Sequence, residues 1–181
     1  RSSHYKARKL GCRNVLARIY LTVIRGTPVV VQLLIIYFVI FASVNVGKTF
    51  VAVLAFGLNS AAYVAEIVRS GIMSIDNGQF EASASLGLNY PKTLLSVILP
   101  QAFKNVLPAL ANECIVLLKE TSVAGYIAVI DLTKGGDIIR SQTYEAFLPL
   151  IAVALIYLIM VMILSSLVTK LERRLARSDR G

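Results

Sequence analysis

Apolar residues run through four long stretches of this chain, at residues 28–46, 50–68, 94–118 and 147–167, and polar residues separate them. A helix needs about 20 apolar residues to cross the hydrocarbon core of a bilayer, which is close to the length of each stretch. The pattern therefore predicts an all-α membrane protein, a polytopic bundle of about four spans.

The third stretch is the least regular of the four. Pro100 and Pro108 predict kinks, because proline removes a backbone donor and its ring crowds the preceding turn. The apolar pattern continues past residue 118 into residues 123–130. We therefore expect this helix to break at membrane depth and resume, which is tolerated where irregular backbone lines a cavity.

Between the second and third stretches lies a polar, small-residue loop at residues 76–91. Residues 79–86 can form a helix of about two turns, and Asp76 and Asn77 can cap the free amides at the start of this helix. Gly87 suits the left-handed position that ends a helix. A helix this short needs a surface to pack on, because isolated helices below about 12 residues are rarely stable.

The side chains of this loop helix suit contact with a partner protein. Small residues at 82–85 would let another surface approach closely, and Glu81 supplies a charge. Phe80, Leu86 and Leu88 add apolar contacts, while Asn89 and Pro91 are typical of the start of a following helix. An ordinary connecting helix without a partner would show the same local pattern.

The loop also resembles a known motif. Glu81, Ala82 and Ser83 are followed after three residues by Gly87, and nine residues later by Val97, Leu99 and Pro100. This order resembles the EAA loop of permease subunits in bacterial ABC importers, with Ser83 and Val97 as departures of similar size. The segments RGTPVVVQ (25–32), NSAAYVAEIVRSGI (59–72), LPQAFKNVLPALANE (99–113) and LLKETS (117–122) resemble the branch that imports polar amino acids.

The resemblance implies a type I importer permease with a cytoplasmic coupling helix, which an ATPase subunit would contact. The residues that it implies for this contact are Phe80, Glu81, Ala82, Ser83, Gly87 and Leu88. It further implies an ATPase dimer that holds the ATP and magnesium, a second permease subunit, identical or homologous, and an extracellular or periplasmic solute-binding protein. Members of this family carry one more span upstream, so we expect the first family span to be missing here.

Composition and charge fix the class of protein and its expected orientation. With 56% hydrophobic and 16% charged residues in 181, the chain leaves no room for a separate soluble domain, so residues 1–181 are expected to form one transmembrane domain. The net charge of +9 lies in segments beside the spans, which indicates the positive-inside pattern rather than a nucleic-acid surface. Residues 1–25 hold seven of the nineteen basic residues and residues 168–181 hold five. With three more around the loop, fifteen lie on one side, which predicts cytoplasmic ends in a bacterial inner membrane.

Two segments outside the spans have patterns of their own. Residues 1–25 place apolar residues at helical spacing among basic ones, which predicts an amphipathic helix at the cytoplasmic surface. A surface anchor or a cleavable presequence would look similar, but a polytopic chain follows. Residues 131–146 carry mixed charges and are interpreted as the outer loop, with Gly135 and Gly136 forming its turn.

Polar residues within the spans are candidate functional residues, because such groups face protein or a water-filled path rather than lipid. Asn59, Tyr63, Glu66 and Ser70 fall at helical spacing on one stripe of the second span. A pathway lining is one interpretation. For Glu66 we favour structural packing, with Arg69 one turn on as its partner.

Glu113 and Glu120 lie seven residues apart, so on a continuous helix both carboxylates face the same way, about 10 Å apart along the axis. Burying a carboxylate at membrane depth costs about 2.5–3.5 kcal/mol on insertion scales, so this pair requires a cation. Lys104, Lys119 or a neighbouring subunit could supply a structural one. Alternatively, the pair receives the cationic group of a basic amino acid, and the family resemblance favours this hypothesis, with Asn59 and Tyr63 as further cargo contacts.

The chain shows no sign of being an enzyme. Residues 42–49, ASVNVGKT, fit a loose phosphate-loop pattern, but they form a turn between two spans instead of joining a strand to a helix. Cys12 and Cys114 have no metal-ligand neighbours, and His4 has no catalytic partner. We expect no catalytic residue, no metal site and no cofactor in this chain.

The resulting hypothesis is the permease subunit of an ATP-driven importer of polar, and specifically basic, amino acids. One alternative keeps the machine but changes the cargo to glutamine or another neutral or acidic amino acid. A second alternative is an ATP-independent channel or ion-coupled carrier whose loop helix is merely structural. A membrane anchor or sensor without transport is disfavoured by the polar residues in two spans.

Overall fold

The computed structural model describes residues 11–177, with side chains described for residues 15–174. Residues 1–10 and 178–181 lie outside the described residues; they include His4 and the outer parts of the two basic end segments. Every regular element within the described range is helical. In chain order these elements are α1 (Gly11–Gly26), α2 (Val29–Ile35), η2 (Ile36–Ile40), α3 (Lys48–Met73), α4 (Asn77–Ser85), α5 (Tyr90–Thr93), η3 (Leu94–Ile98), α6 (Leu99–Glu120), η4 (Thr121–Ile127), α7 (Leu132–Thr143) and α8 (Phe147–Arg177).

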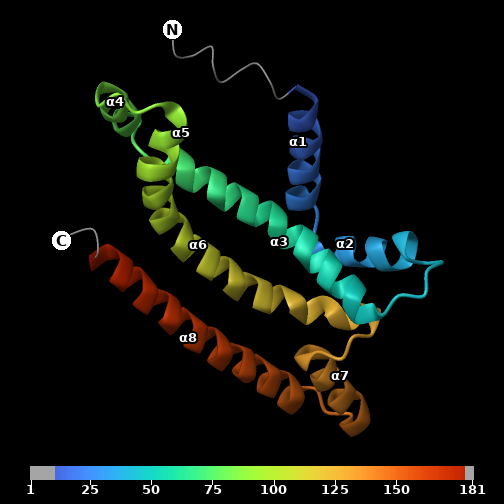
Figure 1. Ribbon diagram of the computed structural model, residues 1–181. Helices are drawn as coiled ribbons and strands as arrows, with labels where there is room; N and C mark the ends of the chain where they lie inside the picture. The colour runs from blue at the N-terminus through green and yellow to red at the C-terminus, as the bar shows by residue number, and fades with distance from the viewer. Residues whose placement is uncertain (1–10, 178–181) are drawn as a thin grey trace.

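Three long helices form the body of the molecule. Figure 1 shows α3, α6 and α8 running side by side, with α4 and α5 at one end of the α3–α6 pair and α7 at the other. The segments Lys48–Met73, Tyr90–Ile127 and Phe147–Arg174 are each long and apolar enough to span a membrane. Only 6% of the most apolar part of α8 is buried, so this helix presents its apolar side chains to lipid or to a partner.

The first predicted span does not form a single helix. Only α2 and η2, of seven and five residues, are helical within residues 28–46, and the chain bends by 111° between them and α1. Pro28 takes extended backbone angles at this bend, and a proline also pushes the residue before it out of the helical region. A count of about four spans therefore holds only if α1 and α2 together make one broken span.

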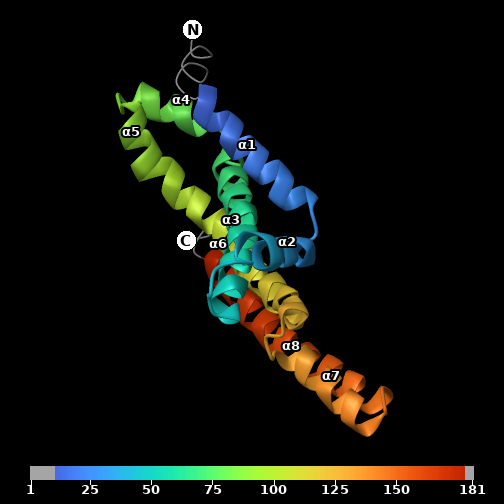
Figure 2. The same cartoon turned by 90° about the vertical axis from the view of Figure 1, so that its right-hand side faces the viewer.

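A buried polar network fixes this bend. The Gln32 amide nitrogen donates to the backbone oxygens of Ile24 and Thr27, at 2.7 and 3.1 Å. The Gln32 amide oxygen accepts from Asn59 Nδ2 on α3, at 3.0 Å. Gln32 and Asn59 are 7% and 2% exposed, so water cannot replace these bonds and the bend is held against α3. Figure 2 shows α2 crossing in front of α3 at this point.

The third predicted span is more continuous than its sequence suggests. Helix α6 passes through Pro108 without interruption, and Pro100 lies in its first turn, where a missing N–H costs little. A π-helical segment, η3, lies directly before α6, and the expected break comes after Glu120, where the helix tightens into the 3₁₀ segment η4. The apolar core lies beside η4, where Ala124 and Ile127 pack with Leu33 of α2 and Val51 and Phe56 of α3.

Residues 131–146 contain a helix, so the prediction of a turn at Gly135 and Gly136 was wrong. Both glycines lie inside α7, which begins where the Asp131 side chain accepts from Lys134 N at 2.8 Å. A Cβ on Gly136 would lie 2.5 Å from Val153 Cγ2 of α8. The glycine is therefore required for close packing of α7 on α8, a long-range reason that a local pattern does not reveal.

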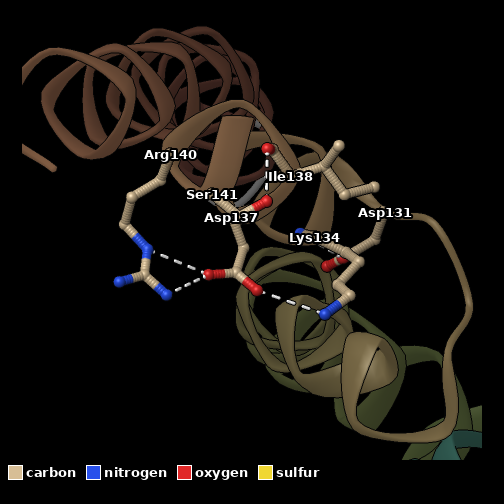
Figure 3. A network of polar contacts seen from close by, with 6 residues as sticks. All are labelled: Asp131, Lys134, Asp137, Ile138, Arg140 and Ser141. Atoms are coloured by element: carbon tan, nitrogen blue, oxygen red, sulfur yellow. Dashed lines mark hydrogen bonds and ion pairs between the residues drawn. The ribbon is translucent and has the colours of Figure 1, made fainter. Parts of the chain in front are cut away.

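Ion pairs on α7 stabilise its surface (Figure 3). Arg140 Nε donates to Asp137 Oδ1 at 3.0 Å, and Lys134 Nζ donates to Oδ2 at 3.1 Å. These bonds, first from the guanidinium and then from the ammonium, hold the pKa of Asp137 below its ordinary value. Their contribution is present above the ordinary carboxyl range and is lost as pH falls through the lowered pKa. Because the groups are exposed, the contribution is small.

Helices α3 and α6 approach each other closely at Gly71. A Cβ on Gly71 would lie only 2.1 Å from Val106 Cγ2 and 3.4 Å from the Ala102 backbone oxygen. Val106 is 6% exposed and branched at Cβ, so its side chain has little room to rotate away. Gly71 therefore sets the separation of α3 and α6.

Replacing this glycine should loosen the α3–α6 pair. We expect Gly71→Ala to lower the free energy of unfolding by about 1–3 kcal/mol relative to Gly57→Ala, because it overpacks a tight contact. Gly57 is a matched control, since it lies in the same helix with no atom within 4 Å of an added Cβ. Thermal unfolding of the detergent-solubilised permease measures the difference. Equal stability of the two variants would contradict this role for Gly71.

Candidate functional site

The loop between α3 and α6 folds into the short helix α4, and its own residues define both ends. The Asp76 side chain accepts from Gly78 N at 2.7 Å and caps the start, as predicted. Gly87 has φ +77° and ends the helix, again as predicted. Gly87 N donates to Ala84 O and Leu88 N to Ser83 O, each at 3.0 Å, which is the hydrogen-bond pattern of a Schellman C-cap. The next helix, α5, starts at Asn89, whose side chain accepts from Lys92 N at 3.1 Å.

Helix α4 presents one face outward and packs the other against the spans. Glu81, Ala82 and Gly87 are exposed, whereas Phe80 and Leu88 are half-buried. Ser83 is 4% exposed and points inward, where its hydroxyl donates to the Gln79 backbone oxygen. The six residues predicted to contact an ATPase therefore divide between an outward surface and its support; their contact with an ATPase stays a prediction.

Side-chain contacts tie α4 to the helices beside it. Phe80 stacks on Tyr90 of α5, with ring centroids 6.2 Å apart and an interplanar angle of 16°. Gln101 Nε2 of α6 donates to Gln79 Oε1 at 3.3 Å and to the Val97 backbone oxygen at 3.0 Å. These contacts connect α4 to α5 and to the start of α6.

The two acidic candidates lie further along α6. Both Glu113 and Glu120 are half-buried on the same continuous helix, as their spacing predicts. Glu113 Oε1 accepts from Ser60 Oγ of α3 at 3.2 Å, which places it at the seam between α3 and α6. Within the described residues neither carboxylate forms an ion pair, with Lys119 or with any other cation. Within residues 15–174 the pair therefore lacks a salt-bridge partner, although Lys119 lies beside Glu120 in the chain.

A groove of about 550 Å³ lies beside this seam, nearer to α4, between the end of α1 and helices α3 and α6. Its polar lining comes from Arg25, Tyr63, Glu66, Ser70, Ser74 and Asn105. Asn105 Nδ2 donates to Ser74 Oγ at 3.0 Å and joins α6 to the end of α3 at the groove edge.

Glu66 pairs with Arg69, as we expected. Arg69 Nε donates to Glu66 Oε2 at 3.0 Å, and a second guanidinium nitrogen contacts Oε1, so the pair is bidentate. Arg25 Nη1 lies 3.6 Å from the same carboxylate, and its guanidinium lies 5.7 Å from the centroid of the Tyr63 ring. One carboxylate is therefore flanked by two guanidinium groups.

The predicted polar stripe on α3 divides between two environments. Tyr63, Glu66 and Ser70 line the groove, but Asn59 turns into the protein and donates to Gln32. At 2% exposure Asn59 supports the α1–α2 bend in this conformation; contact with cargo, for Asn59 and Tyr63 alike, stays a prediction. Sequence reasoning assigned no role to Arg25 or Gln32, although both lie in the segment RGTPVVVQ that carries part of the family resemblance.

Sequence comparison identifies relatives over nearly the whole chain. A family described as "Binding-protein-dependent transport system inner membrane component" matches residues 7–177. The chain is 42% identical over 166 residues to the arginine transport system permease protein ArtQ of Bacillus subtilis, covering 91% of this chain and 76% of ArtQ. It is 40% identical over 165 residues to the glutamine transport system permease protein GlnP of Escherichia coli strain K12, covering 90% of this chain and 75% of GlnP.

Solved structures share the fold. A crystal structure of an amino acid ABC transporter with histidines matches with a TM-score of 0.83 and 47% identity, covering 88% of this chain and 75% of that one. An inward-facing MetNI methionine ABC transporter matches with a TM-score of 0.73 at 21% identity, covering 90% and 74% of the two chains, and supports the fold alone. The EAA-type loop, the helical bundle and these relatives agree, and the chain belongs to the inner membrane components of binding-protein-dependent transport systems, as a permease of the polar amino acid ABC transporter type.

Proposed function

We propose that this chain is the translocating subunit of an ATP-driven importer for basic amino acids, working by alternating access. The observation that carries the choice of cargo is the acidic pair Glu113 and Glu120, half-buried on one helix with no ion-pair partner among residues 15–174. Two carboxylates at membrane depth require positive charge. The ammonium or guanidinium of lysine or arginine supplies it.

A neutral cargo is the second candidate. The relatives include a glutamine permease at 40% identity beside an arginine permease at 42%, so overall similarity does not separate the two. The acidic pair favours the basic cargo, because a neutral side chain would leave the carboxylates uncompensated. A glutamine importer would therefore tolerate neutral residues at positions 113 and 120.

The proposed machine needs partners that this chain does not supply. Membership of a binding-protein-dependent family supports a solute-binding protein outside and an ATPase inside. We assign the outward face of α4 to the ATPase dimer, which would hold the ATP and magnesium. A second permease, identical or homologous, completes the pathway. Basic residues are in excess at both chain ends and around α4, which supports a cytoplasmic position for the two ends and for α4.

Replacing the acidic pair tests the cargo. In proteoliposomes containing the full-length permease, its ATPase and its binding protein, we expect Glu113→Gln with Glu120→Gln to reduce ATP-dependent arginine uptake at least about tenfold, the value of one lost charge-assisted hydrogen bond. Glutamine uptake measured in the same vesicles distinguishes the two cargoes. Unchanged arginine uptake would assign the carboxylates a structural role, and arginine uptake without ATP would support a channel or ion-coupled carrier instead.

Substitutions at Gly87 test the coupling role of α4. A Cβ at φ +77° costs about 1–2 kcal/mol, although no atom lies within 4 Å of it, so the penalty is conformational alone. We expect Gly87→Val to weaken ATPase assembly and lower uptake, because the C-cap distorts and α4 tilts. Gly87→Asn is the matched control, since asparagine tolerates the left-handed conformation, and it should retain both properties. Full uptake by Gly87→Val would show that the geometry of α4 does not matter for transport.

A further inference from the structure

The groove beside Glu66 carries an excess of positive charge. Glu66 is bound bidentately by Arg69, which uses both carboxylate oxygens. Arg25 therefore shares a carboxylate that is already occupied, and its 3.6 Å separation is too long for a hydrogen bond. Among the described residues the Arg25 guanidinium makes no hydrogen bond at all, only this ion pair and the contact with the Tyr63 ring. Its five donors remain available to a ligand that enters the groove.

The surroundings of Arg25 suit a carboxylate. Its side chain is 42% exposed, so a ligand can reach it. Hydroxyl groups of Tyr63 and Ser70 line the same groove and can add hydrogen bonds to a bound anion. A guanidinium presents parallel donors that match the two oxygens of a carboxylate, which a lysine cannot do. Two guanidinium groups beside one carboxylate leave a net charge of about +1 that an anionic group neutralises.

From this geometry we infer that Arg25 binds the α-carboxylate of the amino acid cargo in the groove between α1, α3 and α6. The inference rests on the proposed function and extends it: Glu113 and Glu120 select the side chain, whereas Arg25 recognises the group that every amino acid shares. An arginine at this position thus serves basic and neutral cargo equally.

The contacts of the two sites lie on neighbouring turns of α3. Glu113 is fixed to Ser60, and Arg25 lies over Tyr63, three residues further along α3. Three residues correspond to a rise of about 4.5 Å, close to one helical turn. We therefore place the carboxylate of the cargo at Arg25 and its cationic end toward Glu113.

The α1–α2 bend determines where Arg25 lies. Arg25 is in the last turn of α1, directly after Ile24, whose backbone oxygen accepts from Gln32. Gln32 in turn is held by Asn59 of α3, at 3.0 Å. Gln32 and Asn59 are thus positioning residues: they fix the end of α1 against α3 so that the Arg25 guanidinium stays over Tyr63.

Ligands with and without a carboxylate test this inference. Equilibrium binding to the complete permease–ATPase complex in lipid nanodiscs is measured for arginine and glutamine and for the amines left when each loses its carboxylate, agmatine and γ-aminobutyramide. We expect Arg25→Gln to weaken each amino acid that the wild-type complex binds by about 10- to 100-fold, which corresponds to one charge-assisted hydrogen bond, and to leave the amine derived from it unchanged. Arg140→Gln removes the same charge from α7, outside the groove, and should change none of the four affinities.

The ratio of amino acid affinity to amine affinity decides the outcome. If Arg25→Gln weakens all four ligands equally, or none, Arg25 does not recognise the carboxylate and the inference is overturned. If this variant fails to assemble, Arg25→Lys decides by the same ratio, because it keeps the charge but loses the paired donors and should give a smaller, carboxylate-specific loss. A wild-type complex that binds neither amino acid overturns the proposed function together with the inference. If only the inference about Arg25 is wrong, Glu113→Gln with Glu120→Gln still reduces arginine uptake.

Discussion

The close packing of α3 against α6 is the constraint on which the rest of the structure depends. It is possible because residue 71 has no side chain, since a Cβ there would lie 2.1 Å from Val106 Cγ2. The two antiparallel helices are connected at one end by α4, and hydrogen bonds follow their seam from Asn105 and Ser74 to Ser60 and Glu113. A larger residue at position 71 would separate the helices and misalign these pairs. This contact lies on the seam that also carries the groove and the acidic pair.

The seam orders the functional candidates along the chain's long axis. Helix α4 lies at one end, the groove with Arg25 follows, and Glu113 and then Glu120 lie beyond it. In the proposed importer this order couples two tasks, because the helices that form the groove and the acidic site are the same two helices that α4 joins. Movement of α4 by an ATPase would then change the width of the groove directly, without a separate transmission element. Helix α8, which is mostly exposed, packs on α6 and α7 from outside.

Local chemistry was predictable from sequence, and long-range packing was not. Asp76, Gly87 and Asn89 have the predicted capping roles, because capping depends on residues within one turn. The α1–α2 bend was not predicted, because the length of an apolar stretch does not show where the helix axis changes direction. The hydrogen bond that fixes the bend joins Gln32 to Asn59, 27 residues away. The turn predicted at Gly135 and Gly136 failed for the same reason, since Gly136 serves contact with α8 rather than a turn. In the sequence Arg25 is one basic residue among many in the first segment. Its position beside both Tyr63 and Glu66 is visible only in the folded structure.

In the proposed importer, α4 and the start of α6 move as one body when ATP drives transport. Gln79 and Gln101 are in contact across these two elements, so a covalent link between them tests the claim directly. The measurement is ATP-dependent uptake by a full-length permease with Gln79→Cys and Gln101→Cys, in which Cys12 and Cys114 are replaced by serine, before and after a short thiol-reactive cross-linker. We expect unchanged uptake, because the link joins groups that do not separate. Loss of uptake on cross-linking, with ATPase assembly intact, would show that α4 moves relative to α6 during transport.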